Sequence, residues 1–205
     1  MIKVWGRMTS TNVQKVMWCI DELGVAHEHI DIPHGRAKEE PAYLAMNPNG
    51  LVPTIQDDDF VLWESNACVR YIAAKFGAGT LWPSDLRQRA DAERWMDWQL
   101  TTLSAPGWTI FLGFVLTKPE QRDMTAIAAA TKRFNELWTI ADKVLATRKF
   151  VAGDQLTIGD IPMGIAAYRW FTIPVERDRH PNVEAWYGRL TEHPSFKKNV
   201  MTGLL

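Results

Sequence analysis

The chain has 205 residues, of which 46% are hydrophobic, which is enough for two modest domains with cores of their own. Its 23 lysines and arginines nearly balance its 24 aspartates and glutamates, so the charge argues against a nucleic-acid-binding protein. We find no apolar run of membrane-spanning length and no secretory signal pattern, and we therefore expect a soluble, cytoplasmic protein. Cys19 and Cys68 lie inside helical patterns, which predicts buried free thiols rather than a disulfide.

The first part of the chain alternates strand and helix signals. Ile2–Trp5 is a short β-prone run, and apolar residues at helical spacing predict a helix from about Val13 to Leu23, ended by Gly24. His27–Ile32 alternates as a second strand. This order predicts a βαβ unit with two parallel strands. A polar loop rich in hydroxyl groups leads from the first strand into its helix.

A turn and a hairpin follow within residues 47–65. Asn47–Gly50 is a cluster of turn-forming residues, and two short β-prone runs flank three aspartates in the manner of a hairpin. Pro53 stands at the mouth of the first of these strands, and a cis Val52–Pro53 bond there would turn the backbone of Val52 outward, toward a bound peptide. Ser65 begins the next helix and Glu64 precedes it. A carboxylate and a hydroxyl are therefore expected beside the free backbone N–H groups of the helix N-terminus.

Strand signals nearly vanish after residue 77, which divides the chain into three parts. We expect an α/β domain of thioredoxin-like order (βαβ–ββα) over residues 1–77, a linker over 78–86 and an all-helical bundle over 87–205. Pro106 and Gly107 are expected to break or kink one of its helices. Thr157–Asp160 has the form of a capping box and precedes an apolar helix, so we assign it to stability rather than to catalysis.

The Asn47–Pro53 turn, the Glu64–Ser65 pair and the strand–loop–helix that carries Ser10 together resemble the glutathione S-transferase superfamily over essentially the whole chain. Its bacterial-type serine members, which are theta-, phi-, zeta- or nu-like, are the most similar. The resemblance implies a glutathione-binding thioredoxin-like domain, glutathione as co-substrate without a metal, and a homodimer of a detoxifying enzyme.

The resemblance also implies the glutathione-binding residues. Val52 would pair with the cysteinyl backbone, Glu64 with the α-ammonium group, and Ser65 with the α-carboxylate. Lys38 matches a position that often holds the glycine carboxylate, and Arg36 is a nearby substitute. The complete set carried over by position is Lys38, Leu51, Val52, Pro53, Glu64 and Ser65.

Catalysis requires the glutathione thiol to ionise, although its reference pKa of about 8.5 leaves little thiolate at neutral pH. A hydroxyl at a helix N-terminus that donates to sulfur favours the thiolate, and a shift of two pKa units takes roughly 2.7 kcal/mol. By position in the family, Ser10 is the predicted donor, with Thr9 and Thr11 as alternatives. The competing interpretation is that these hydroxyls only cap the helix.

Three functions stay open at this point. The first is a transferase in which the thiolate attacks a hydrophobic electrophile, with Met8, Thr102, Pro106, Trp108 and Phe111 as walls of the acceptor pocket. The second is disulfide reduction that uses Ser10 and Asn12, since one bacterial branch of the family holds sulfur with such a pair. The third is a glutathione-binding or interaction module without efficient chemistry. No cysteine lies between Met8 and Asn12, which disfavours an enzyme thiol.

Overall fold

The computed structural model of the chain describes residues 1–204 and contains two compact units. The first unit comprises residues 1–82 together with 194–203, and the second comprises residues 83–193 with residue 204.

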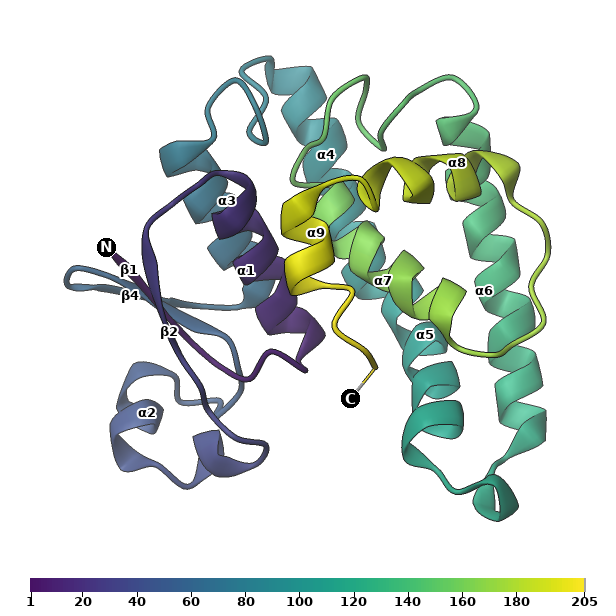
Figure 1. The fold of residues 1–205 in the computed structure, drawn as a ribbon, viewed down its shortest axis with the longest axis horizontal. Coiled ribbons are helices and arrows are strands. Elements are labelled where there is room, and N and C mark those ends of the chain that lie inside the picture. Colours follow the sequence, from purple (N-terminus) through teal and green to yellow (C-terminus); the bar gives the residue numbers. More distant parts are fainter. Residues whose placement is uncertain (205) are drawn as a thin grey trace. The chain divides into compact units, whose positions relative to one another are not determined.

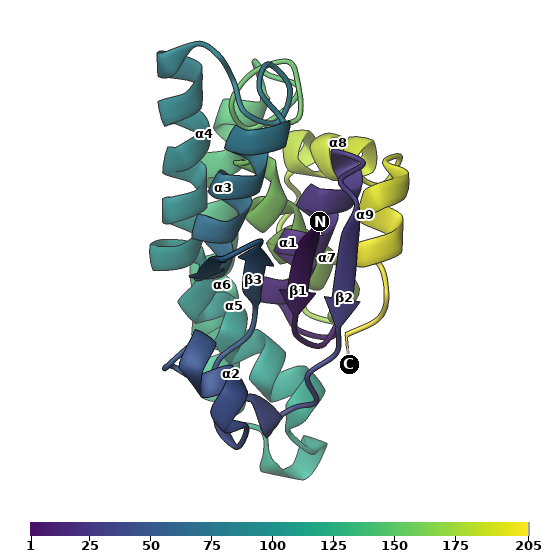
Figure 2. The ribbon, with the colours of Figure 1, turned by 90° about the vertical axis from the view of Figure 1, so that its left-hand side faces the viewer.

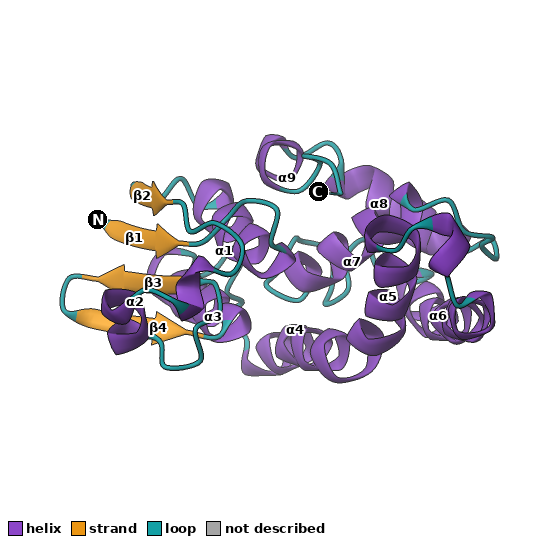
Figure 3. Cartoon of the chain, turned by 90° about the horizontal axis from the view of Figure 1, so that it is seen from below, coloured by secondary structure: helices purple, strands orange, loops and turns teal. Residues whose placement is uncertain are grey.

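The first unit is built on a four-stranded sheet. Its strands are β1 (Ile2–Trp5), β2 (His27–Ile30), β3 (Thr54–Asp57) and β4 (Phe60–Trp63). Their order is β2-β1-β3-β4; Figure 2 labels the first three, and Figure 3 labels all four. β1 pairs in parallel with β2 and antiparallel with β3, and β3 forms an antiparallel hairpin with β4. The predicted βαβ–ββα order is therefore confirmed.

Helices α1 (Thr11–Glu22) and α3 (Ser65–Phe76) lie side by side against this sheet (Figure 1). Two short helices, η1 (Arg36–Lys38) and α2 (Pro41–Met46), lie between β2 and β3 in the chain and were not predicted. They are too short to show a helical period, and Pro41 at the first position of α2 was the only clear signal.

The last helix of the chain, α9 (Pro194–Asn199), packs on α1 and so belongs to the first unit. The rings of Trp18 and Phe196 meet edge to face with centroids 4.8 Å apart, and both side chains are fully buried. From the sequence we expected this segment in the helical domain of residues 87–205. Periodicity identifies an apolar helix face, but it does not reveal which distant segment covers that face.

The second unit is built of helices joined by loops, drawn in purple and teal in Figure 3. Its elements are α4 (Leu86–Trp98), η2 (Gln99–Leu103), α5 (Ser104–Phe111), η3 (Leu112–Leu116), η4 (Pro119–Gln121), α6 (Met124–Leu145), α7 (Asp160–Thr172) and α8 (Pro181–Leu190). The rings of Phe134, Trp138, Trp170 and Trp186 contact one another in its core. Most of its tryptophans are therefore core residues.

The predicted break at Pro106–Gly107 does not occur, because the helix runs through from Leu86 to Leu116. The π-helical turn η2 precedes Pro106, and such a wide turn accommodates a proline ring and its missing N–H.

The continuous helix Leu86–Leu116 also corrects our expectation that no segment is long and apolar enough to span a membrane. This helix reaches a mean hydropathy of 1.2 over eighteen residues and by length and composition alone could span a membrane, a test that helices of soluble proteins also pass.

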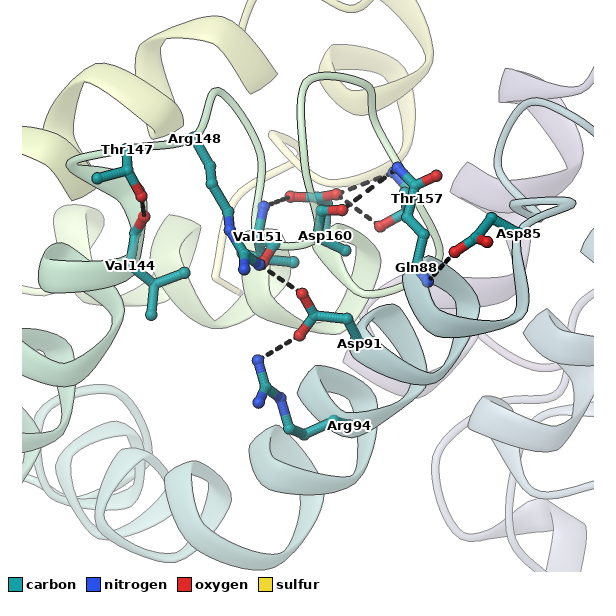
Figure 4. Close-up of polar contacts among 11 residues, drawn as sticks. Asp85, Gln88, Asp91, Arg94, Val144, Thr147, Arg148, Val151, Thr157 and Asp160 are labelled. Carbon is teal, nitrogen blue, oxygen red and sulfur yellow. Dashed lines mark hydrogen bonds and ion pairs between the residues drawn. The ribbon is translucent and has the colours of Figure 1, made fainter.

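The predicted capping motif forms the buried link between α7 and its surroundings (Figure 4). Asp160 Oδ2 accepts from the Thr157 backbone N–H at 2.9 Å and from its hydroxyl at 3.1 Å. Its Oδ1 accepts from the Val151 N–H at 3.0 Å and from the Trp186 indole N–H at 2.9 Å. Burial raises the pKa of Asp160, while these four donors act in the opposite direction. The motif therefore ties α7, α8 and the preceding loop together.

Candidate active site

Ser10 stands at the N-terminus of α1 in an extended conformation, with φ −83° and ψ 120°. Its carbonyl accepts the first helical bond, from the Gln14 N–H at 2.9 Å, but its hydroxyl makes no capping bond. Asp85 and Asp123, by contrast, cap their helices through the side chain. Capping therefore does not explain the Ser10 hydroxyl, which has no hydrogen-bond partner within residues 1–204.

Asn12, two residues after Ser10, contacts the start of α3. Asn12 Oδ1 accepts a hydrogen bond from the Ser65 hydroxyl at 3.2 Å, so residues 53 positions apart in the chain are in direct contact. Thr11 is the first residue of α1 and is half-buried, whereas Thr9 is exposed. The structure thus brings together the two predicted halves of the site, the first loop and the Glu64–Ser65 pair.

A polar network fixes the turn before Pro53. The carbonyl of Leu51 accepts from the Tyr43 hydroxyl at 2.7 Å and from Asn47 Nδ2 at 2.8 Å. Both side chains also contact the buried hydroxyl of Thr54. Tyr43 was not predicted, since nothing in the sequence shows that α2 turns it toward the turn. The network holds the backbone leading to Val52 in place, while the Leu51 side chain stays exposed.

Val52 itself presents free backbone groups. The Val52–Pro53 peptide bond is cis, and no described residue hydrogen-bonds to the N–H or C=O of Val52. Gly6 allows the close approach of this turn to α1, because a Cβ atom there would lie 2.5 Å from Val13 Cγ2 and 2.9 Å from Val52 Cβ. Val13 and Val52 therefore both flank Gly6, and a larger residue at position 6 would push them apart.

Glu64 adopts a strained backbone conformation at the start of α3. Its φ of 72° is rare for a residue with a side chain, and such strain costs on the order of 1–3 kcal/mol and concentrates at functional sites. The Glu64 carboxylate is exposed, and the buried Ser65 follows it as the first residue of the helix. A free N–H and the helix dipole at this position favour a bound anion.

Lys15, on α1, is a buried cation that our sequence analysis missed. Its side chain is 4% exposed, and within residues 1–204 it has no hydrogen-bond or ion-pair partner. Burial lowers the pKa of Lys15 to about 8, and the Glu64 carboxylate partly opposes this effect. A lysine in an amphipathic helix usually faces solvent, so only its position between Val13 and Val16 hinted at burial.

Of the two basic candidates for the glycine carboxylate, Lys38 is the one without an ion-pair partner among the described residues. Arg36 pairs with Glu39 at 2.8 Å, whereas the exposed Lys38 packs its stem against the turn, where a Cβ on Gly50 would lie 2.8 Å from Lys38 Cγ. This contact keeps Lys38 beside the turn that leads to Val52.

Among residues 1–204, no group of three or more histidine, cysteine, aspartate or glutamate side chains could hold a metal ion.

The predicted acceptor residues are divided between the two units. Met8 belongs to the first unit, and Thr102, Pro106, Trp108 and Phe111 belong to the second. Within the second unit, Trp108 is 53% exposed and stacks on the buried Phe111, with ring centroids 5.7 Å apart. Thr102 lies in the π-helical turn before them. α5 therefore presents an aromatic surface.

Comparison with known proteins gives one family for both parts of the chain. Models of the glutathione S-transferase N-terminal and C-terminal domains match residues 9–75 and 108–194. The glutathione S-transferase GstB of Escherichia coli K12 is 44% identical over 98% of both chains. A theta-class glutathione S-transferase from Xanthomonas axonopodis pv. citri, solved with glutathione bound, is 43% identical, with a TM-score of 0.94 over 100% of this chain and 99% of that one. Glutathione S-transferase I from maize, in complex with an atrazine glutathione conjugate, is 25% identical, with a TM-score of 0.87 over 98% and 96% of the two chains. The chain therefore belongs to the glutathione S-transferase family of enzymes.

Proposed function

We propose that this glutathione S-transferase activates glutathione through Ser10 and transfers it to a hydrophobic electrophile. The observation that carries the proposal is the Ser10 hydroxyl, which stands at a helix N-terminus without a capping bond or any other partner among the described residues. Such a hydroxyl donates to a thiolate and lowers the thiol pKa together with the helix dipole.

The rest of the first unit provides the groups that a glutathione molecule needs. The free N–H and C=O of Val52 pair with the cysteinyl backbone in the manner of an added strand. The Glu64 carboxylate binds the α-ammonium group, and Ser65 at the start of α3 binds the α-carboxylate. Lys38, beside the Gly50 turn, binds the glycine carboxylate. The Xanthomonas relative was solved with glutathione bound, which supports glutathione as the ligand.

In the transfer step, the glutathione sulfur forms a bond to the electrophilic carbon of the acceptor, and the leaving group departs with its bonding electron pair. For a chlorinated arene the leaving group is chloride. Ser10 keeps the thiol ionised before the attack, and Asn12 orients the Ser65 hydroxyl through their hydrogen bond. Thr11 shares the helix N-terminus and is the alternative donor.

The acceptor is mostly apolar and aromatic. The Trp108–Phe111 stack and the exposure of Trp108 support this assignment for the helical unit, with Met8, Thr102 and Pro106 as further contacts.

We further propose a cytoplasmic homodimer with a detoxifying role. Two buried, free cysteines support a reducing compartment.

A second candidate function is glutathione-dependent reduction of small disulfides. It is favoured by the Asn12 amide, whose oxygen is engaged by Ser65 and whose exposed Nδ2 therefore stays available to a second sulfur. The glutathione thiolate would attack the disulfide, one thiolate would leave, and a second glutathione would complete the exchange.

Retention on immobilised glutathione, followed by parallel assays with an aryl halide and a small disulfide, tests these proposals. We expect retention and faster turnover of the aryl halide. Retention with faster turnover of the disulfide would favour the second function, and retention without any turnover would identify a binding module. Failure to bind glutathione would contradict both enzymatic proposals.

A further inference from the structure

Arg169, in the last turn of α7, lies over an aromatic ring of α5. Its guanidinium carbon is 3.7 Å from the centroid of the Phe111 ring, which is the distance of direct stacking. Phe111 in turn stacks on Trp108, with ring centroids 5.7 Å apart. Guanidinium, phenyl and indole groups thus form one cluster within the helical unit, which we call the Arg169 cluster.

The charge of Arg169 is not balanced within residues 1–204. No described carboxylate or hydrogen-bond acceptor contacts its guanidinium, and the residue is half-buried. Burial lowers the pKa of Arg169 to about 10, and no acidic neighbour opposes this effect. Several other arginines of the unit have polar partners: Arg133 and Arg148 pair with carboxylates, and Arg177 donates to the carbonyls of Trp170 and Ile173.

A partly buried guanidinium without an acceptor is costly, because its five N–H groups lose water without replacement. Stacking on Phe111 occupies one face of the planar group and leaves its N–H edge available. That edge matches a carboxylate in a two-point contact, and the attraction is strengthened where water is excluded. The cluster therefore combines an anion-binding edge with an aromatic surface, since Trp108, which stacks on Phe111, is 53% exposed.

We infer that the Arg169 cluster binds the second substrate, and that this substrate is an aryl electrophile bearing a carboxylate. The carboxylate pairs with the edge of Arg169 and the aryl ring lies on Trp108. This inference rests on the proposed transferase function and specifies its substrate class. In the reaction with a chlorinated nitrobenzoate, the glutathione sulfur bonds to the chlorinated ring carbon and chloride leaves, while the carboxylate is unchanged.

The test compares two acceptors that differ only in charge, a chlorodinitrobenzoate and the matching chlorodinitrobenzamide. The variants are Arg169→Gln, which removes the charge, and Arg169→Lys, which keeps the charge but loses the planar fork. Arg179→Gln is the control, because Arg179 has 85% side-chain exposure and lies 3.8 Å from Glu184 at the surface of the same unit. Binding of the unreactive dinitrobenzoate and dinitrobenzamide is measured in parallel by quenching of tryptophan fluorescence.

We expect the wild-type protein to prefer the benzoate over the benzamide in kcat/KM and in binding by about tenfold or more, the effect of a charge-assisted pair. Arg169→Gln abolishes this preference with little change for the benzamide, Arg169→Lys retains part of it, and Arg179→Gln retains all of it. An equal preference in Arg169→Gln and wild type, or no preference in wild type, overturns the inference but not the transferase proposal. Absence of turnover with both acceptors overturns the transferase proposal, and the binding experiment then decides the role of Arg169.

Discussion

Replacement of Asp160 by asparagine should strongly destabilise the helical unit. Both carboxylate oxygens of Asp160 face donors, namely two backbone N–H groups, an indole N–H and a hydroxyl (Figure 4). An asparagine has only one acceptor oxygen, so either orientation of the amide points its NH₂ group at a buried backbone N–H. The least costly orientation turns NH₂ toward Thr157, whose hydroxyl can accept while its backbone N–H loses its partner.

The magnitude follows from these contacts. Loss of one hydrogen bond to a charged group costs about 1.5–3 kcal/mol, and a stranded buried N–H costs about 1–3 kcal/mol more, so we expect a decrease of about 3–5 kcal/mol in the free energy of unfolding. At about 2–4 °C per kcal/mol for a chain of this length, Tm should fall by roughly 6–20 °C.

Thermal and urea unfolding, followed by circular dichroism, measure this decrease. Asp123→Asn is the matched control, because Asp123 is an exposed helix cap that accepts only from the Ala126 N–H at 2.9 Å, and asparagine caps helices equally well. Its effect should stay within about 0.5 kcal/mol. A decrease for Asp160→Asn no larger than that of the control would refute the buried-network reasoning.

Two further predictions concern the first unit. Burial lowers the pKa of Lys15 from 10.5 to about 8 in the folded protein, so the folded state loses this proton at lower pH than the unfolded state. The free energy of unfolding should therefore rise with pH between those two values. Lys15→Met should remove that rise and stabilise the protein at neutral pH by about 3 kcal/mol, as urea unfolding at several pH values would show. An unchanged pH profile in that variant would contradict the assignment. Gly6→Ala should weaken glutathione binding measured by calorimetry, because its Cβ would push Val13 and Val52 apart, and binding equal to wild type would rule out this close approach.

Much of the first unit could be predicted because its signals are local. Strand alternation, the helical period of α1 and the turn residues 47–50 each act over a few neighbouring positions, and they fix the βαβ–ββα order. The assignment of Ser10 and Ser65 to one candidate site was accessible only through the resemblance to a family, because it depends on the tertiary fold.

The remainder depends on packing between distant segments. Burial of Lys15, the contact of Asn12 with Ser65 and the stacking of Arg169 on Phe111 join residues whose spacing in the chain carries no information about contact. The helix through Pro106 was missed because local propensity disfavours proline there, whereas a π-helical turn accommodates it.

The central claim, that Ser10 ionises bound glutathione, is tested most directly by the thiol pKa of glutathione in the binary complex, measured by ultraviolet absorbance of the thiolate. We expect a pKa about two units below the reference of about 8.5 in the wild-type protein, and a return toward about 8.5 in Ser10→Ala with nearly unchanged glutathione affinity. Ser84→Ala, at an exposed serine of the helical unit, serves as the control and should behave as wild type. An unshifted thiol pKa in the wild-type complex, or the same lowered pKa in Ser10→Ala, would contradict the claim.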